Sequence, residues 1–258
     1  MGKINWAFDM KYDIENHFVN GSWRTLERLA VKITKDASKT AKSKMNPVLG
    51  GGTRLMIDMK HRISDDIDLF INNPQWIGYL TPRLNDRFEN EFDSYDEGST
   101  SLKLKTPIGE IDFIVSMSLL GLPNERSNDC VFELEPIAEV LVKKLFYRGW
   151  ALTPRDLFDW KMIESKLPTS VTHITDIAKL LSGRTAQITN SLIALKKSTR
   201  SKTIWDAIKA NDLPDFHESI DWAEKRIVDF NQINISNQKM AKAASGIKLP
   251  KSDGPFSS

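Results

Sequence analysis

The sequence has 258 residues, of which 40% are hydrophobic, so the chain is long enough to bury one large core or two smaller ones. Its 36 basic and 34 acidic side chains leave a net charge of +2, which excludes any argument for a nucleic-acid partner from total charge alone. The apolar runs are far shorter than the ~20 residues of a membrane helix, so we expect no membrane span.

The cysteine and histidine content speaks against a zinc enzyme. Cys130 is the only cysteine, which excludes an intramolecular disulfide and suits a reducing cytosol. The four histidines lack the i,i+4 spacing of a metal-binding pair. Because the first eighteen residues lack the apolar core of an export signal, we expect a cytoplasmic protein without membrane contact.

The fold class that the patterns predict is α+β, with a small mixed β-sheet and helices followed by a helical C-terminal half. Residues 1–135 would form the core, with an N-terminal helical segment. The stretch 103–115 alternates and is interrupted by Thr106-Pro107-Ile108-Gly109, which predicts a hairpin. The β-rich runs of this half are residues 47–49, 67–71, 102–105 and 110–115.

After Pro136 the apolar spacing changes to three and four, which predicts a helix. Thr153-Pro154 would begin another, with proline at the first helical position. We expect residues 136–236 to form a helical domain that contributes Lys and Asp side chains to a cleft, and residues 237–258 to be a disordered tail. Further helices are predicted at 171–182, 185–209 and 215–232.

A turn of three glycines, Gly50 to Gly52, precedes Thr53 and a cluster of four carboxylates. Glycines let a backbone approach an anion, and the N–H groups of Gly51, Gly52 and Thr53 at the start of a helix can bind phosphate. Side chains alternate along the predicted strand 67–71, so Asp66 and Asp68 should share one face. Asp58 and Asp65 would then be surface charges.

Two carboxylates on one face repel each other, and a divalent cation removes that repulsion. Mg²⁺, or Mn²⁺ in its place, binds one or two carboxylates and completes its shell with phosphate and water. Asp112 would join Asp66 and Asp68 as a third metal ligand, or act as a general base, if the hairpin pairs beside their strand. The glycine turn, the Asp66 and Asp68 pair, and Asp112 are each common on their own, in turns and solvated strand ends. Their occurrence together in this order indicates nucleotidyl transfer.

Lys144 lies on the apolar stripe of the predicted helix after Pro136, and Arg148 follows on the same face. A buried ammonium needs an anion, either a triphosphate or an acidic partner such as Asp156. Both cations could instead extend past a packed stem into solvent. Asp156 could simply cap the helix that begins at Thr153, and Asp159, one turn on, is a weaker second choice.

These motifs together resemble the AbiEii/AbiGii nucleotidyltransferase toxins of the polymerase-β-like superfamily. The resemblance covers about residues 45–165. It is carried by Gly-Gly-Thr, by the segment His61 to Phe70, by Glu139 to Leu145, and by Arg148 with Arg155-Asp156-Leu-Phe-Asp159. It implies catalytic roles for Asp66, Asp68, Asp112, Lys144 and Asp156. It also implies NTP binding by Gly51, Gly52, Thr53, Arg62, Ser64, Lys144 and Arg148.

The resemblance further implies a toxin of a bacterial toxin–antitoxin or phage-defence pair, with a cognate antitoxin as partner. Some relatives add nucleotides to the 3′ end of tRNA, which makes tRNA, or another RNA, the expected acceptor. In some relatives an antitoxin phosphorylates a serine placed like Ser64, and a phosphate there would repel triphosphate. Arg62 could contact phosphate, hold Asp66, or lie at the surface.

Two basic runs could contact an RNA backbone if they line the cleft, although such runs are more often solvated helix faces. They are residues 32–44 and 196–202. Two other functions stay open: an enzyme that transfers AMP to protein, and a non-catalytic module that binds a nucleotide or a partner. Labelled NTP with RNA or protein distinguishes the two enzymes, and absence of NTP and Mg²⁺ binding would favour the module.

Overall fold

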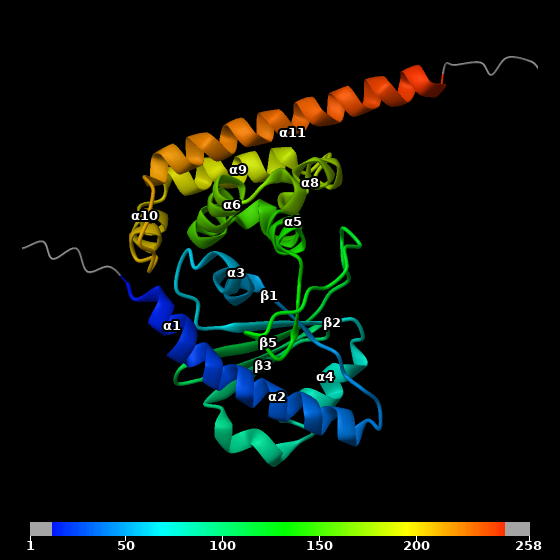
Figure 1. Ribbon diagram of the computed structural model, residues 1–258, viewed down its shortest axis with the longest axis vertical. Helices are drawn as coiled ribbons and strands as arrows, with labels where there is room; N and C mark the ends of the chain where they lie inside the picture. The colour runs from blue at the N-terminus through cyan, green and yellow to red at the C-terminus, as the bar shows by residue number, and fades with distance from the viewer. Residues whose placement is uncertain (1–11, 246–258) are drawn as a thin grey trace, which may run out of the picture.

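The computed structural model describes residues 12–245. It places a β-sheet with its helices in one half of the molecule and a helical assembly in the other, with the long helix α11 along the outer side (Figure 1). The predicted boundary at residue 135 falls between strand β6 and helix α5. Among the described residues, no helix is both long and apolar enough to span a bilayer.

The described residues include a six-stranded mixed sheet with strand order β3-β4-β5-β2-β1-β6. The β5–β2 and β1–β6 pairs are parallel, and the other pairs are antiparallel. The predicted α+β class is therefore confirmed, whereas the sequence patterns missed β3 and β6. The strands are β1 Val48–Gly50, β2 Ile67–Ile71, β3 Ser94–Glu97, β4 Ser101–Thr106, β5 Gly109–Val115 and β6 Glu133–Leu134.

The predicted hairpin is present as β4 and β5, which pair in antiparallel fashion from Ser101–Ile114 to Thr106–Gly109. Strand β5 then runs parallel to β2, so that Asp112 lies directly beside Asp68. This register brings together two carboxylates that are 44 residues apart in the sequence.

One face of the sheet packs on helix α2 (Ser22–Thr40), which Figure 1 shows on the side away from the helical half. Leu69 and Phe113 from the strands meet Trp23 and Leu26 from the helix in one buried core. Helices α1 (Ile14–Asn20) and α4 (Gln75–Leu80) and the 3-10 helix η1 (Asp86–Glu91) complete this half. Because side chains alternate, the polar residues of β2 and β5 lie on the opposite face.

Helix α3 (Gly51–Met59) follows β1 directly and packs between the sheet and the helical half. The first two helices of that half are α5 (Ile137–Arg148) and α6 (Pro154–Lys166). Thr153 caps α6 in a reciprocal arrangement with Asp156, as the sequence predicted. The remaining helices are α7 Thr169–Thr172, α8 Ile174–Leu180, α9 Thr185–Lys197, α10 Thr199–Asp206 and α11 Phe216–Ser245, with the 3-10 helix η2 Gly149–Ala151 after α5.

Two predicted boundaries in the helical half are wrong. The single helix expected over 185–209 is divided at Ser198, whose hydroxyl accepts the Ser201 N–H and so begins a new helix. The tail expected to be disordered from residue 237 is helical as far as Ser245, because α11 extends from a packed helix and adds residues without a new nucleation step. The rest of that predicted tail, 246–258, lies outside the described residues.

Candidate active site

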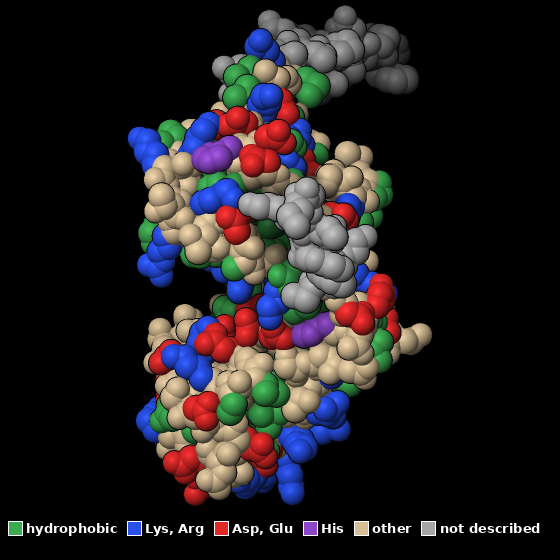
Figure 2. Space-filling model, turned by 90° about the vertical axis from the view of Figure 1, so that its left-hand side faces the viewer, with side chains coloured by type: hydrophobic (Ala, Val, Ile, Leu, Met, Phe, Trp, Pro, Cys, Tyr) green, Lys and Arg blue, Asp and Glu red, His purple; other side chains and the backbone are tan. Residues whose placement is uncertain are grey.

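A cavity of about 780 Å³ lies between the polar face of the sheet and the start of the helical half. Figure 2 shows the molecule narrowing to a waist between the two halves, with acidic and basic side chains gathered along it. Ten of the predicted site residues line this cavity. They are Gly51, Gly52, Arg62, Ser64, Asp66, Asp68, Asp112, Lys144, Arg148 and Asp156.

The carboxylates meet as the strand periodicity predicted. Ile67 and Leu69 are buried in the core below the sheet, while Asp66 and Asp68 both face the cavity. Asp112 projects beside Asp68 from the neighbouring parallel strand. The Glu110 N–H donates to Asp66 Oδ1 at 3.1 Å and holds that carboxylate at the edge of the sheet.

Burial and mutual repulsion disfavour the charged forms of these carboxyls. Burial raises the pKa of Asp68, and the nearby Asp66 raises it further. Burial and the charge of Asp68 raise the pKa of Asp112 to about 6. Lys103 on β4 opposes this rise, with its Nζ 3.1 Å from Asp112 Oδ2.

The donor set of the cavity suits a hard divalent cation. Among the described residues no three His, Cys, Asp or Glu side chains are spaced as a ready-made metal site. Mg²⁺ in nucleotide enzymes needs only one or two carboxylates, with substrate phosphate and water as further ligands. The carboxylates of Asp68 and Asp112, which are register partners on neighbouring strands, meet that requirement together with Asp66 on the same face, and a cation would relieve their repulsion.

The glycine turn makes room for side chains that converge on the cavity. Gly51 has a φ of +64°, and a Cβ added to it would lie 1.7 Å from Asp68 Oδ2. A Cβ on Gly52 would lie 2.5 Å from Arg62 Nη2 and 2.8 Å from Ser64 Oγ. Both glycines are therefore required by the neighbouring side chains, whatever anion their N–H groups bind.

Thr53 was predicted to bind phosphate through the backbone N–H groups around it, and that stays a prediction. Thr53 is fully buried and does not line the cavity, and its hydroxyl donates to the Asp66 carbonyl at 2.5 Å. The hydroxyl is thus used to fix the backbone of the carboxylate loop against α3.

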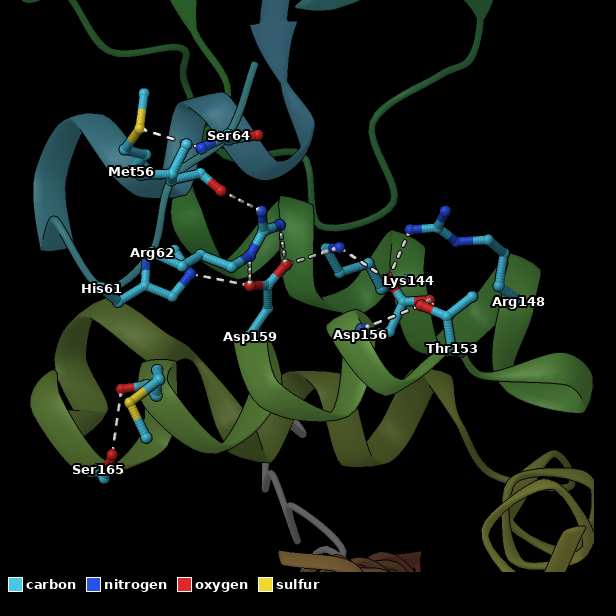
Figure 3. A network of polar contacts seen from close by, with 12 residues as sticks. Met56, His61, Arg62, Ser64, Lys144, Arg148, Thr153, Asp156, Asp159 and Ser165 are labelled. Carbon is cyan, nitrogen blue, oxygen red and sulfur yellow. Dashed lines mark hydrogen bonds and ion pairs between the residues drawn. The ribbon is translucent and has the colours of Figure 1, made fainter. Parts of the chain in front are cut away.

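A buried ion network joins the carboxylate loop to helices α5 and α6 (Figure 3). Lys144 Nζ lies 2.7 Å from Asp156 Oδ1 and 3.0 Å from Asp159 Oδ2, so the buried ammonium has the acidic partner that its position on the apolar stripe required. Burial acts to lower the pKa of Lys144, but these two carboxylates outweigh it and raise the pKa. Arg148, about half exposed, donates to Asp156 at 2.7 Å.

Asp159, predicted as the weaker second choice, is the centre of this network. Arg62 donates to both of its oxygens, at 2.7 and 3.0 Å, and His61 Nε2 lies 2.8 Å from Oδ1 (Figure 3). Burial raises the pKa of Asp159, yet Arg62 and Lys144 outweigh burial and hold it well below its ordinary value. Burial lowers the pKa of His61, which favours its neutral form.

The predictions for Arg62 and Asp65 need correction. Arg62 neither holds Asp66 nor lies at the surface, because its guanidinium is buried and directed to Asp159. Asp65 is more than a surface charge, since it accepts from Ser22 and lies 3.2 Å from His17 Nε2, joining the loop to α1 and α2. Asp58 is exposed as predicted, and it also pairs with the buried Arg54 at 2.9 Å.

Five further charged residues line the cavity that were not predicted as site residues: Lys103, Glu110, Glu135, Lys143 and Arg155. Lys143 contacts Glu135 and lies 4.1 Å from the centre of the Phe70 ring. Burial raises the pKa of Glu135 to about 7. A lysine next to Lys144 and an acidic residue before a helix carry little signal alone, because charged residues are common at such positions.

Neither basic run identified in the sequence lines this cavity. Lysines 32, 35 and 39 belong to α2, which covers the other face of the sheet. In the second run, Lys196 pairs with Asp221 at 2.6 Å, and Lys202 pairs with Asp206. The basic runs are therefore helix surfaces outside this cavity.

No protein-family model matches the sequence, and no match is found among curated proteins. Solved structures do resemble the fold. MenT4, a nucleotidyltransferase toxin from Mycobacterium tuberculosis, aligns at a TM-score of 0.50 and 14% identity over 88% of this chain and 91% of MenT4. JHP933 from Helicobacter pylori aligns at 0.46 and 13% identity over 87% of this chain and 98% of its own. At such identity the likeness to MenT4 concerns the fold.

Proposed function

We propose that this protein is a metal-dependent nucleotidyltransferase toxin that transfers a nucleoside monophosphate from an NTP to RNA. The observation that carries the proposal is the placement of Asp66, Asp68 and Asp112 on one face of the sheet, opposite Lys144 and Arg148 across one cavity. The likeness of the fold to MenT4, itself described as a nucleotidyltransferase toxin, supports the same reaction class.

Each wall of the cavity has its own part in the proposed reaction. Asp66, Asp68 and Asp112 would hold Mg²⁺ or Mn²⁺, which when bound supplies positive charge to the α-phosphate. Lys144 and Arg148, with the N–H groups of Gly51 and Gly52, would contact the triphosphate. Asp156 touches both cations and orients them.

The chemical step is a substitution at the α-phosphorus of the NTP. The acceptor hydroxyl oxygen forms a bond to that phosphorus, and the bond from the phosphorus to the oxygen that bridges to the β-phosphate breaks. Pyrophosphate leaves with the electron pair. The hydroxyl proton passes to a carboxylate, for which Asp112 is the candidate because it lies beside Asp68 in the cavity.

The biological role follows from the sequence resemblance and stays part of the proposal. Transfer to the 3′ end of tRNA would block translation, and a cognate antitoxin would restrain it. Ser64 is buried and lines the cavity, so a phosphate on its hydroxyl would place negative charge where the triphosphate binds.

Transfer is tested by incubating the purified chain with each α-labelled NTP, Mg²⁺ and total RNA from bacteria. We expect label in RNA with at least one NTP, and pyrophosphate release in equal amount. Asp68→Asn should lower transfer by at least about 100-fold, since it removes a metal-binding carboxylate at nearly constant volume. Asp176→Asn, on the exposed surface of α8, is the matched control.

Digestion of the labelled material by RNase or by protease identifies the acceptor. Label that resists RNase and is lost with protease would replace the RNA acceptor by protein. Absence of label with every NTP, or full activity of Asp68→Asn, would contradict the proposed function.

A further inference from the structure

A second cavity, of about 300 Å³, adjoins the first at Asp66. It is bounded by the carboxylate loop, by the hairpin turn at Ile108 and Gly109, and by residues 207–209 after α10. Its volume is at the lower end of the ~300–1,000 Å³ found for ligand pockets. It is therefore large enough to receive part of a second substrate.

The two cavities share four lining residues: Arg62, Ser64, Asp66 and Arg155. Asp66 is fixed in this shared wall by the Glu110 N–H at its carboxylate and by the Thr53 hydroxyl at its carbonyl. A transferase must bring its two substrates together at the reacting atoms. Two cavities that meet at a fixed carboxylate have the arrangement that such a reaction requires.

Two exposed cations of the smaller cavity are suited to contact phosphate groups. Arg155 and Lys209 are exposed, and neither forms an ion pair within residues 12–245. Of the other charged groups in the lining, Arg62 is paired with Asp159, while the carboxylates of Asp65 and Asp66 accept hydrogen bonds from Ser22 and from the Glu110 N–H. The exposed cations Arg155 and Lys209 are thus the groups of this lining that can contact phosphate.

Lys209 is held in place although its side chain is exposed. Its carbonyl accepts the Ile63 N–H at 2.9 Å, which ties residues 207–209 to the carboxylate loop. The neighbours Ile208 and Ala210 are buried in the helical core. The lysine therefore presents its charge from a fixed backbone position at the opening of the cavity.

We propose that the smaller cavity is the acceptor site, where the end of a single-stranded RNA enters with its terminal hydroxyl toward Asp66 and its backbone phosphates on Arg155 and Lys209. This assignment rests on the proposed function. Ile108, 44% exposed at the hairpin turn, offers an apolar contact to the terminal nucleotide. Contacts of this kind bind the backbone without reading sequence.

Binding of RNA tests the assignment independently of catalysis. The probe is a fluorescein-labelled single-stranded oligoribonucleotide of about 12 nucleotides, followed by fluorescence anisotropy without NTP. We expect Lys209→Glu to weaken binding by about ten-fold or more, since it replaces a charge-assisted contact by repulsion. The slope of log affinity against log salt should fall by about one for Lys209→Ala.

Lys197→Glu is the matched control, because Lys197 is exposed at the end of α9 and lines neither cavity. The Lys197→Glu variant should bind the oligoribonucleotide with an affinity within about two-fold of that of the native chain. The Lys209→Glu variant should likewise bind a labelled, non-hydrolysable NTP with an affinity within about two-fold of that of the native chain. Thermal unfolding of each variant checks that the fold is intact.

Equal RNA affinity in the native chain and Lys209→Glu, an equal loss in Lys197→Glu, or no RNA binding by the native chain would overturn the acceptor site. Failure of the proposed function looks different, since it would appear as absent NTP binding or absent pyrophosphate release. Label transferred only to protein would overturn the acceptor site while leaving nucleotidyl transfer intact.

Discussion

Asp159 is the carboxylate whose loss should destabilise the fold most. It is fully buried and contacts Arg62 at 2.7 and 3.0 Å, His61 at 2.8 Å and Lys144 at 3.0 Å. Removing one partner of a buried ion pair costs about 3–5 kcal/mol, because the remaining charge is left uncompensated. Asp159→Asn keeps the volume of the side chain, so a cavity adds little to that cost. We expect the free energy of unfolding to fall by about 3–5 kcal/mol, a large part of the ~5–15 kcal/mol typical of a domain.

Urea unfolding at pH 7 measures this difference. Burial acts to raise the pKa of Asp159, but Arg62 and Lys144 hold it well below the ordinary value of 3.8. A carboxyl with a lowered pKa stabilises the fold above its unfolded pKa, and this contribution is lost as the pH falls through the folded pKa. At pH 7 the contribution of Asp159 is complete, so the whole difference between the native chain and the variant is measurable.

The control is Asp176→Asn, which removes an exposed carboxylate 3.0 Å from Lys179. Such surface pairs contribute at most about 1 kcal/mol. If Asp159→Asn also unfolds within about 1 kcal/mol of the native chain, the buried charges of Arg62 and Lys144 do not depend on Asp159 and the reasoning is refuted.

Three further outcomes separate chemistry from folding. In Asp68→Asn label transfer should be lost while the free energy of unfolding at pH 7 rises, because the raised pKa of Asp68 means that its charge destabilises the fold as the pH rises. A loss of both transfer and stability would contradict this. Gly51→Ala should lower transfer by about 100-fold, since the new methyl would displace Asp68, whereas Gly78→Ala, whose methyl meets nothing within 4 Å, should change transfer by less than about two-fold. Removal of divalent cations by EDTA should stop transfer, and added Mg²⁺ should raise the Tm of the native chain but not of Asp68→Asn; activity that persists in EDTA would exclude the metal.

The sequence predicted the sheet side of the site because strand periodicity is a local rule. Alternation placed Asp66 and Asp68 on one face, and the Pro107–Gly109 turn defined the hairpin that carries Asp112. Helical periodicity likewise placed Lys144 on a buried stripe, and the cost of an unpaired buried charge then required an anion beside it. These predictions needed no knowledge of the packing between distant elements.

The errors concern partners that only packing selects. Arg62 and Asp159 are 97 residues apart, and no local pattern indicates that α6 places one against the other. The sequence patterns made no prediction for the Thr53 hydroxyl, because its acceptor, the Asp66 carbonyl, is determined by how α3 meets β2. The break at Ser198 was readable, since serine is a strong N-cap, but continuous apolar spacing concealed it.

The charges of the cavity divide between its two walls. On the helical wall four cations, Arg62, Lys144, Arg148 and Arg155, stand with two carboxylates, Asp156 and Asp159, which leaves two positive charges. Arg148 and Arg155 are the exposed cations of this wall. On the sheet wall the carboxylates outnumber Lys103. A chain that needed this waist only for stability would gain from apolar side chains there, because buried ion networks add little net stability. A negative wall opposite a positive wall instead matches a ligand that carries a metal cation on one side and phosphate on the other. A metal-bound nucleoside triphosphate has this distribution of charge.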